Sequence, residues 1–364
     1  MRKSLRATVA IVAITIFTLP TAYAADFTMG AGENTGLSGV SPFAMTIDAS
    51  SDRVFYSGGL NGLNMATCPS RGQCPSPATL PMSFGSDYTQ VTLTNGSQRA
   101  YFVNINPDTR GKSISTALVT YSNGTPSLGA TADLGFSVSA EQRAWGVPDS
   151  TLLPDGRVRL YWVTTPASSQ VQSGATAKQV KCLVKKLGKS KVKKLSKGAN
   201  PRSKDKKALK KCKVNLTDIS AGNTKTPEVI VSATSTDSTG TQFVSDAGYR
   251  FTGGFVDPEI VQAKTGNWIA LLSTGPGAPP QRLYVATSQD GLAWRVHKTA
   301  LTSTSVDSLD PTTVRTGPNT WRVYYAQSPK ASPLAKPAPS VGSAPSAPAP
   351  LSTNYTLLRA TLRR

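Results

Sequence analysis

The sequence predicts an all-β fold, a five-bladed β-propeller made of four-stranded antiparallel blades. Two segments, 256–272 and 309–325, share one pattern: an Asp-Pro step, a short strand, a turn with Gly or Asn, and an apolar strand bearing aromatic residues. Looser copies begin near Ser41, Asp87 and Val147. Units that recur every ~45 to 60 residues are typical of propeller blades. Helical periodicity is nearly absent outside the N-terminus and a lysine-rich segment.

Each repeat supplies one blade, and the five blades are expected at 41–82, 87–134, 145–253, 255–302 and 308–362. Turns rich in Gly, Pro and Asp divide blade four into four strands, which are expected at 259–262, 268–272, 282–287 and 294–297. A lysine-rich insertion at 175–215 interrupts blade three, and a stretch of Pro, Ala and Ser at 328–352 interrupts blade five. The second stretch has too little apolar surface to order itself, so we expect an extended loop.

The N-terminus has the features of an export signal. Arg2, Lys3 and Arg6 precede an apolar run, and Ala22-Tyr23-Ala24 matches the small-residue pattern of a cleavage site. Residues 1–24 are therefore predicted to be a secretory signal peptide, followed by a single propeller domain at 25–364. No later stretch approaches the ~18 apolar residues of a membrane span. We expect a secreted, extracellular protein with no transmembrane segment in its mature chain.

The formal net charge of +20 is concentrated in the insertion of blade three. Sixteen of the 40 Lys and Arg residues lie between Lys178 and Lys213, where Asp205 is the only acid. The rest of the propeller is nearly neutral, so the charge does not indicate a nucleic-acid-binding fold, and the insertion lacks aromatic residues on which bases could stack. The expected partner is an anionic cell-wall polymer, an acidic polysaccharide or phospholipid, and a solvated loop without a partner is the alternative.

The four cysteines fall into two local pairs. In an exported protein they predict two disulfides, Cys68 with Cys74 and Cys182 with Cys212, the second of which brackets the lysine-rich stretch. A zinc site is not expected, because CxxC spacing is absent and His297 is the only histidine. A single histidine also argues against most His-containing catalytic triads, and no phosphate-binding glycine motif opens a helix.

Polar residues at the start of the innermost strands meet near the axis of a propeller. The blade openings supply such residues, namely Ser41, Asp87, Asp149, Asp257 and Asp310. Glu259 follows Asp257 by two positions and so lies on the same face of its strand. Carboxylates gathered at one opening raise each other's pKa, as in the paired-carboxylate chemistry of glycoside hydrolysis. Their oxygens are also compatible with Ca²⁺, and no other cofactor is expected.

A structural role for these acids is an alternative to the catalytic role. An Asp-Pro step is an ordinary way to begin a strand, since Asp caps local N–H groups and Pro fixes φ. This applies to Asp257 and Asp310, and in weaker form to Asp149. Glu259 has no such explanation.

The blade openings resemble those of the five-bladed propellers of arabinanases, β-xylosidases, levansucrases and invertases. The Ser288-x-Asp290-Gly291-x-x-Trp294 pattern that closes blade four is also similar to a shortened sialidase Asp-box, whose Asp shapes a turn. The resemblance implies a glycoside hydrolase that acts on arabinose-, xylose- or fructose-type glycans.

In arabinanase-like enzymes an Asp of blade one is the general base, an Asp of blade three tunes the acid, and a Glu of blade four is the general acid. By position, Asp149 matches the blade-three role. Glu259 and Asp257 compete for the role of the acid, because the family's Glu stands before the Pro and here Asp257 does. The resemblance therefore implies a proton donor at one of these two residues.

Blade one departs from the family pattern. Ser41-Pro42 stands where the base is expected, and a hydroxyl cannot replace a carboxylate base unaided, so Asp87 in blade two, or Glu33 on the N-terminal segment, would have to supply it. Substrate contacts are expected from Ser41, Asp310 and Trp145. The departure at Ser41 keeps a second class open, a noncatalytic carbohydrate-binding or cell-surface adhesion propeller.

Overall fold

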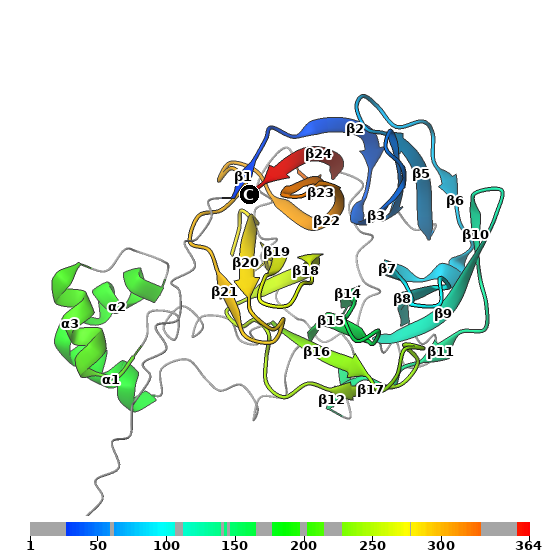
Figure 1. Ribbon diagram of the computed structural model, residues 1–364. Helices are drawn as coiled ribbons and strands as arrows, with labels where there is room; N and C mark the ends of the chain where they lie inside the picture. The colour runs from blue at the N-terminus through cyan, green and yellow to red at the C-terminus, as the bar shows by residue number, and fades with distance from the viewer. Residues whose placement is uncertain are drawn as a thin grey trace, which may run out of the picture.

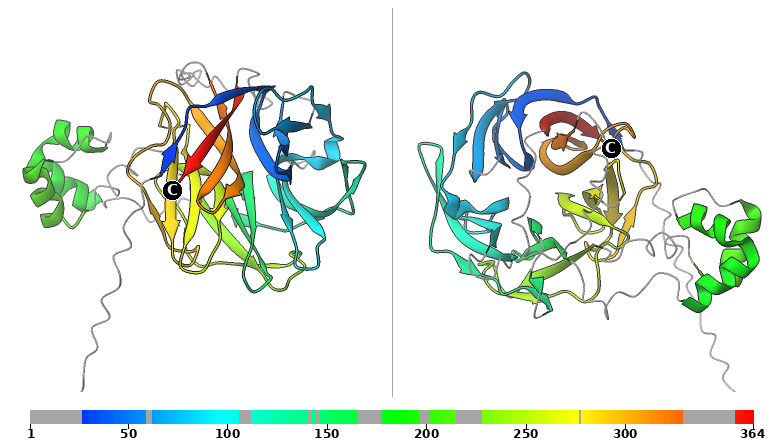
Figure 2. Two further views of the ribbon diagram at one scale, coloured as in Figure 1. Left: turned by 45° about the horizontal axis from the view of Figure 1, so that its top comes forward. Right: turned by 180° about the vertical axis from the view of Figure 1, so that it is seen from behind.

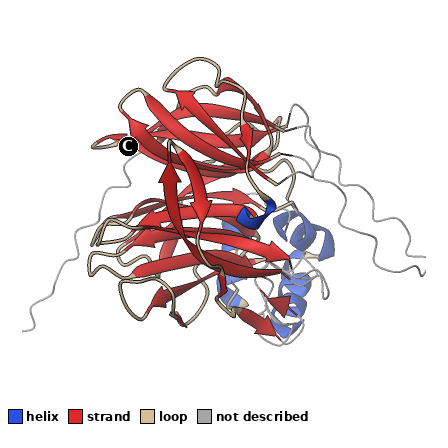
Figure 3. Ribbon diagram, turned by 90° about the vertical axis from the view of Figure 1, so that its right-hand side faces the viewer, coloured by secondary structure: helices blue, strands red, loops and turns tan. Residues whose placement is uncertain are grey.

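A computed structural model describes residues 27–58, 62–105, 112–139, 142–143, 146–164, 177–196, 202–214, 228–276, 278–328 and 355–364. Five antiparallel sheets surround a common axis, which confirms the predicted five-bladed propeller (Figure 1). Apart from one short turn of helix, the helices lie together outside the strands of the ring (Figure 3). The predicted signal peptide, 1–24, and nearly all of the Pro-rich stretch, 328–352, lie outside the described residues.

The blades follow the chain in order, and each begins with its innermost strand. Blade one contains β3 Val40–Asp48, β4 Ser51–Ser57, β5 Leu63–Pro69 and β6 Ala78–Thr79. Blade two contains β7 Ser86–Thr92, β8 Gln98–Ile105, β9 Lys112–Ser122 and β10 Thr125–Leu128, with β11 Ala132–Asp133 beside β9. Blade three contains β14 Gly146–Leu152, β15 Val158–Thr164, β16 Val229–Ser235 and β17 Phe243–Ser245.

The last two blades complete the ring. Blade four contains β18 Phe255–Gln262, β19 Trp268–Thr274, β20 Leu283–Ser288 and β21 Trp294–Val296. Blade five contains β22 Ser308–Gly317, β23 Thr320–Gln327 and β24 Thr356–Arg363. Short elements join the blades: the 3₁₀ turn η1 Met82–Phe84 precedes blade two, and the small hairpin of β12 Ser137–Ser139 and β13 Gln142–Arg143 precedes blade three.

The fourth strand of blade five comes from the other end of the chain. β1, Thr28–Met29, and β2, Glu33–Ser38, both pair antiparallel with β24, so the N-terminal segment forms the outer edge of the last blade (Figure 1). Thr28 lies opposite Arg363 in this pairing. The sequence pattern did not predict this closure, because it assigned blade five to 308–362 alone.

The core is divided among the junctions between blades. Five hydrophobic clusters each join residues of two neighbouring blades, and together they cover all five junctions of the ring. Aromatic residues are prominent in them: Phe136 stacks on Trp162 between blades two and three, with ring centroids 4.2 Å apart. Trp321 is 1 % exposed where blades four and five meet. Each blade is thus held mainly by its neighbours, as expected for repeats that cannot bury a face alone.

The lysine-rich insertion is a folded unit. It forms three helices, α1 Ala177–Leu187, α2 Lys189–Ser196 and α3 Ser203–Lys211, and so differs from the solvated loop that the sequence left open as an alternative. Their apolar residues enclose a small core that includes Leu183, Leu195 and Leu209, and the predicted Cys182–Cys212 disulfide adjoins it. Both views of Figure 2 place this three-helix unit beside the ring. No described helix is long and apolar enough to cross a membrane.

The predicted Cys68–Cys74 disulfide is also formed, in blade one. Cys68 ends β5 and is fully buried, whereas Cys74 lies in the loop that follows. The bridge closes a tight loop that contains Ser70, Arg71 and Gly72. This loop faces the outer edge of blade five, since the backbone N–H of Cys74 donates to the carbonyl of Thr35 next to β24.

Candidate active site

Every inner strand begins with the same local distortion. A residue with positive φ, between 49° and 52°, occupies one equivalent position in each blade: Ser41, Asp87, Val147, Asp257 and Asp310. The pairing of the inner strand with its neighbour shifts at this point in all five blades. Such bulges turn a strand and redirect its side chains. We call these five residues the first axial layer.

The polar residues predicted to meet at the axis do so. They line one small cavity of about 30 Å³, together with Phe43, Tyr88 and several neighbouring residues, and those of the prediction are Ser41, Asp87, Asp149, Asp257, Glu259 and Asp310. A volume of this size has room for about one water molecule. Trp145, the remaining predicted substrate contact, lies outside the described residues.

Side chains of the first axial layer bind the backbone of the following blade. The N–H of Asp310 donates to Asp257 Oδ2 at 3.3 Å, and the N–H of Ser41 donates to Asp310 Oδ2 at 2.9 Å. The N–H of Val147 donates to Asp87 Oδ2 at 3.3 Å. The Ser41 hydroxyl donates to Asp87 Oδ1 at 2.8 Å. Of the five junctions, only the one between blades three and four has no hydrogen bond from a side chain of this layer, because the side chain of Val147 is apolar.

A second axial layer repeats this arrangement two residues further along the strands. The N–H of Ile260 donates to Asp149 Oδ2 at 2.6 Å, which links blade three to blade four. The N–H of Thr313 donates to Glu259 Oε1 at 2.7 Å, which links blade four to blade five. Blade five continues the series, since Thr312 Oγ1 accepts the N–H of Ala44 at 3.2 Å. The carboxylates therefore have a structural role, but they stabilise the neighbouring blade and not their own turn.

The register of blade three differs from the sequence prediction. Asp149 was expected to be the counterpart of Asp257, but Val147 has the positive φ and precedes Pro148. Asp149 is instead the counterpart of Glu259, because both lie two residues beyond that position. The two residues are thus neighbours in one layer, and Val147 takes the position in blade three that Asp257 takes in blade four.

Burial raises the proton affinity of the second layer. Burial raises the pKa of Asp149 to about 6, although the Ile260 N–H and the Thr89 hydroxyl oppose this change. Burial and then the charge of Asp149 raise the pKa of Glu259 well above its usual range. Two interacting carboxyls share protons as a pair. A proton bound to this pair therefore favours Glu259 over Asp149.

The first layer contains a second interacting pair. Burial raises the pKa of Asp257, and burial together with the charge of Asp257 raises the pKa of Asp310 well above its usual range. The interaction between the two side chains lowers the pKa of Asp257 and raises that of Asp310, so a proton bound to this pair favours Asp310. Ser273 on β19 donates a further hydrogen bond to Asp257.

Glu228 is a carboxyl near the axis that the sequence pattern missed. It immediately precedes β16, and burial together with the charge of Asp257 raises its pKa to about 7. Its carboxyl packs against Gly275, where an added Cβ would lie 2.4 Å from Glu228 Oε2. No local signal marks this residue, because it follows the insertion and belongs to no repeat.

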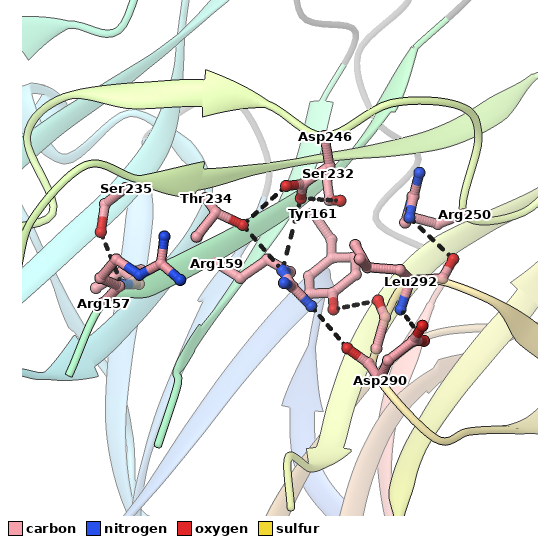
Figure 4. A network of polar contacts seen from close by, with 12 residues as sticks. Arg157, Arg159, Tyr161, Ser232, Thr234, Ser235, Asp246, Arg250, Asp290 and Leu292 are labelled. Carbon is pink, nitrogen blue, oxygen red and sulfur yellow. Dashed lines mark hydrogen bonds and ion pairs between the residues drawn. The ribbon is translucent and has the colours of Figure 1, made fainter. Parts of the chain in front are cut away.

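The Asp-box-like turn has a structural part in the fold. Asp290 Oδ1 accepts the N–H groups of Leu292 and Ala293, so the side chain shapes its own turn. Blade three binds this turn through two hydrogen bonds. Arg159 donates to the Asp290 carbonyl, and Arg250 donates to the Leu292 carbonyl (Figure 4). Asp290 does not line the axial cavity. Among the described residues, no group of three or more His, Cys, Asp or Glu is placed to hold a metal ion.

No protein-family model and no curated protein matches the sequence. Among solved structures, the chain is similar to an endo-arabinase from Bacteroides thetaiotaomicron, with 11% identity, a TM-score of 0.50, and coverage of 83% of this chain and 93% of that one. A GH43 protein from Bacillus licheniformis matches with 8% identity, a TM-score of 0.47, and coverage of 82% and 51%. This chain therefore spans about half the length of that protein. The five-bladed fold is shared with this group of structures.

Proposed function

We propose that this propeller is an exported glycoside hydrolase that acts on arabinose-, xylose- or fructose-type glycans. The observation that carries the proposal is the pair formed by Asp149 and Glu259, two interacting buried carboxyls of the second axial layer, in which the charge of Asp149 adds to the effect of burial and raises the pKa of Glu259 further. Acid and base roles in glycosidases are divided between carboxyls in this way. The fold shared with an endo-arabinase supports the class of substrate.

In the proposed reaction Glu259 donates the proton to the leaving glycosidic oxygen. The charge of Asp149 raises the proton affinity of Glu259 and so keeps the proton there until it is transferred to the leaving oxygen, after which Glu259 takes up a new proton from solvent. Asp87 is the proposed base, oriented by the Ser41 hydroxyl, and the water-sized cavity between these carboxyls is where an attacking water would fit. Asp257 is the second candidate for the proton donor.

Hydrolysis of arabinan, xylan and fructan by the wild type and by Glu259→Gln tests this assignment. The variant should lower kcat by at least ~100-fold, because the amide cannot donate a proton to the leaving group. Asp155→Asn, which changes an exposed turn carboxylate of blade three, is the matched control and should retain full activity. Equal turnover by wild type and Glu259→Gln would remove Glu259 from the mechanism.

A second candidate function is glycan binding without turnover. It is favoured by Ser41, which stands where the resembling enzymes are expected to carry their base, and by an axial cavity of about 30 Å³. Ligand sites commonly measure ~300 to 1,000 Å³. Retention of arabinan- or xylan-derived oligosaccharides, with no product released and no effect of Glu259→Gln, would favour this function over hydrolysis.

We also propose that the three-helix unit binds an anionic polymer, such as an acidic polysaccharide of a cell wall. Its single acid is occupied internally, since Asp205 is buried, pairs with Lys191 at 3.1 Å and accepts the N–H of Arg202. Every other described lysine of the unit is exposed. The described part of the unit therefore presents a surface rich in exposed lysines, which favours polyanions and makes binding dependent on salt.

Deletion of residues 178–213 tests this partner. The wild type should bind polygalacturonate at low ionic strength and release it as salt is raised, whereas the deletion variant should not bind. Catalysis on a neutral glycan should be the same in both proteins. Undiminished polygalacturonate binding by the deletion variant would contradict the proposal, and a preference for anionic vesicles over the polysaccharide would reassign the partner.

Export is likewise a proposal, and two features support it. Residues 1–24 have the pattern of a signal peptide. The four cysteines form two disulfides, which persist in oxidising compartments. Detection of the processed protein, beginning at Ala25, in culture medium would test the cleavage site and the destination together.

A further inference from the structure

A larger cavity lies away from the axis, at the outer edge of the ring. It measures about 480 Å³ and shares no residue with the axial cavity. One wall is blade five with its N-terminal edge, where β1 and β2 run along β24 (Figure 1). The other wall is the loop of blade one that the Cys68–Cys74 disulfide closes, which contributes Ser70 and Arg71. We call this cavity the arginine cleft.

Four arginines line the cleft, and the sheet register explains why they gather there. Arg359 and Arg363 are four positions apart on β24 and so project from one face, with Thr361 between them. Arg322 on β23 lies opposite Thr361 and adds its guanidinium to the same face. Arg71 approaches from the loop of blade one.

Two of these arginines are held by the protein. Arg359 is 3 % exposed, pairs with Glu33 at 2.8 Å and donates to the Gly72 carbonyl at 2.7 Å. Arg322 pairs with Asp52, which is fully buried beneath the cleft. These contacts fix the guanidinium groups and tie blade five to blade one.

The other two arginines give the cleft a net positive charge. Arg71 and Arg363 are exposed, and neither forms an ion pair with a described residue. Four guanidinium groups thus face two carboxylates. The backbone around them is preorganised, because the N–H of Gly72 donates to Glu33 Oε1 at 2.7 Å and the disulfide closes the loop. A rigid site loses less free energy when a ligand binds.

We propose that the arginine cleft binds an oxyanion carried by a hydrophilic, sugar-sized ligand, through a carboxylate or a phosphate group. Guanidinium forks match the geometry of both anions and bind them with two parallel hydrogen bonds. The volume falls in the range of small-ligand sites, and hydroxyls of Thr28, Ser70 and Thr361 line the walls. The site is separate from the axial carboxyls, so it stands whether or not they are catalytic.

Calorimetric titration with sodium glucuronate, inorganic phosphate and neutral xylose tests the proposal. At least one of the two anions should bind, and xylose should not. Arg71→Gln and Arg363→Gln should each weaken anion binding about tenfold, since each removes charge-assisted hydrogen bonds, and the double variant should weaken it about a hundredfold. Both side chains are exposed and unpaired among the described residues, so the variants should keep the wild-type melting temperature.

Arg295→Gln is the matched control. Arg295 is exposed on β21 in blade four, so the substitution removes the same charge without touching the cleft, and it should leave anion binding unchanged. Glucuronate binding alone would identify a carboxylate ligand, and phosphate binding alone a phosphate ligand. Binding of neither anion, equal binding of xylose, or an equal loss in the control variant would each overturn the proposal.

Discussion

Val147 shows how the bulge at the axis constrains the backbone conformation of a single residue. Positive φ is unfavourable for β-branched side chains, yet Val147 adopts φ 51° because the bulge at the start of every inner strand requires it. The other blades place Ser or Asp at this position, and their side chains bind a neighbouring blade. Val147 therefore carries the backbone strain without the hydrogen bond.

Val147→Asn should stabilise the protein by about 1 kcal/mol. Asparagine tolerates positive φ better than valine, and its amide can reach the junction with blade four that now lacks a bond. Chemical denaturation of both proteins measures the difference, with Val163→Asn, a fully buried position on the adjacent strand, as a control that should be strongly destabilised. A lower midpoint for Val147→Asn would show that apolar packing matters more there than strain.

The buried carboxyls should make the protein more stable at mildly acidic pH than at neutral pH. Folding raises the pKa of Asp149 from its ordinary value of 3.8 to about 6, so between these values the folded state binds more protons than the unfolded state. Stability is then lost as the pH rises through this window, by about 3 kcal/mol for this group. Asp257, Glu259 and Asp310 shift in the same direction. Thermal unfolding between pH 4 and 7 should show the effect, and Asp149→Asn should reduce its slope.

At the scale of the element, the strands were predictable where their signal is local. The strands of blade four were predicted correctly, because the Asp-Pro step, the turn and the apolar strand with aromatic residues follow one another closely in the sequence. β2 was missed because its residues, Glu33–Ser38, are mostly polar and find their partner at the far end of the chain. The helices of the insertion were missed because dense lysines hide the few apolar residues that form their core.

The three-helix unit should depend on its disulfide. Its core contains few large apolar side chains, and units of this size commonly need a covalent cross-link. The Cys182–Cys212 bridge closes a loop with a sequence separation of 30, which contributes about 4 kcal/mol in the chain-entropy account. Cys182→Ser with Cys212→Ser should remove most of the helical circular dichroism. The propeller should keep its own melting transition, and simultaneous loss of both would contradict an independent unit.

At the scale of the whole molecule, stability should depend on how the ring is closed. Leu37 on β2 is 3 % exposed and packs in the cluster between blades five and one. Leu37→Ala should cost about 3 kcal/mol, as buried Leu→Ala changes do. Ile47→Ala, at an exposed position of blade one, should cost less than about 0.5 kcal/mol. Similar melting temperatures for both variants would mean that the N-terminal strand adds little to closure.

The candidate active site was predictable only where its residues belong to the repeat. Convergence of the acids at the axis follows from the repeat itself, so Asp87, Asp257 and Asp310 were placed correctly. The partnership of Asp149 with Glu259 was not, because blade three has Val147 before its Pro where blades four and five have Asp, so the pattern aligned Asp149 with Asp257 instead of Glu259. Glu228 and the arginine cleft arise from segments distant in sequence, and only the closed ring brings them together.

The pairing of Thr28 with Arg363 makes the order of the blades along the chain arbitrary. A short peptide could join these two strands, and the chain could then be opened at another turn, such as Asn95-Gly96 in blade two. Such a circular permutant would keep every junction between blades and both cavities, while moving the chain ends to the opposite part of the ring. The edge strands β1 and β2 would then follow β24 directly, as the second arm of an antiparallel hairpin, and every strand of blade five would be continuous along the chain.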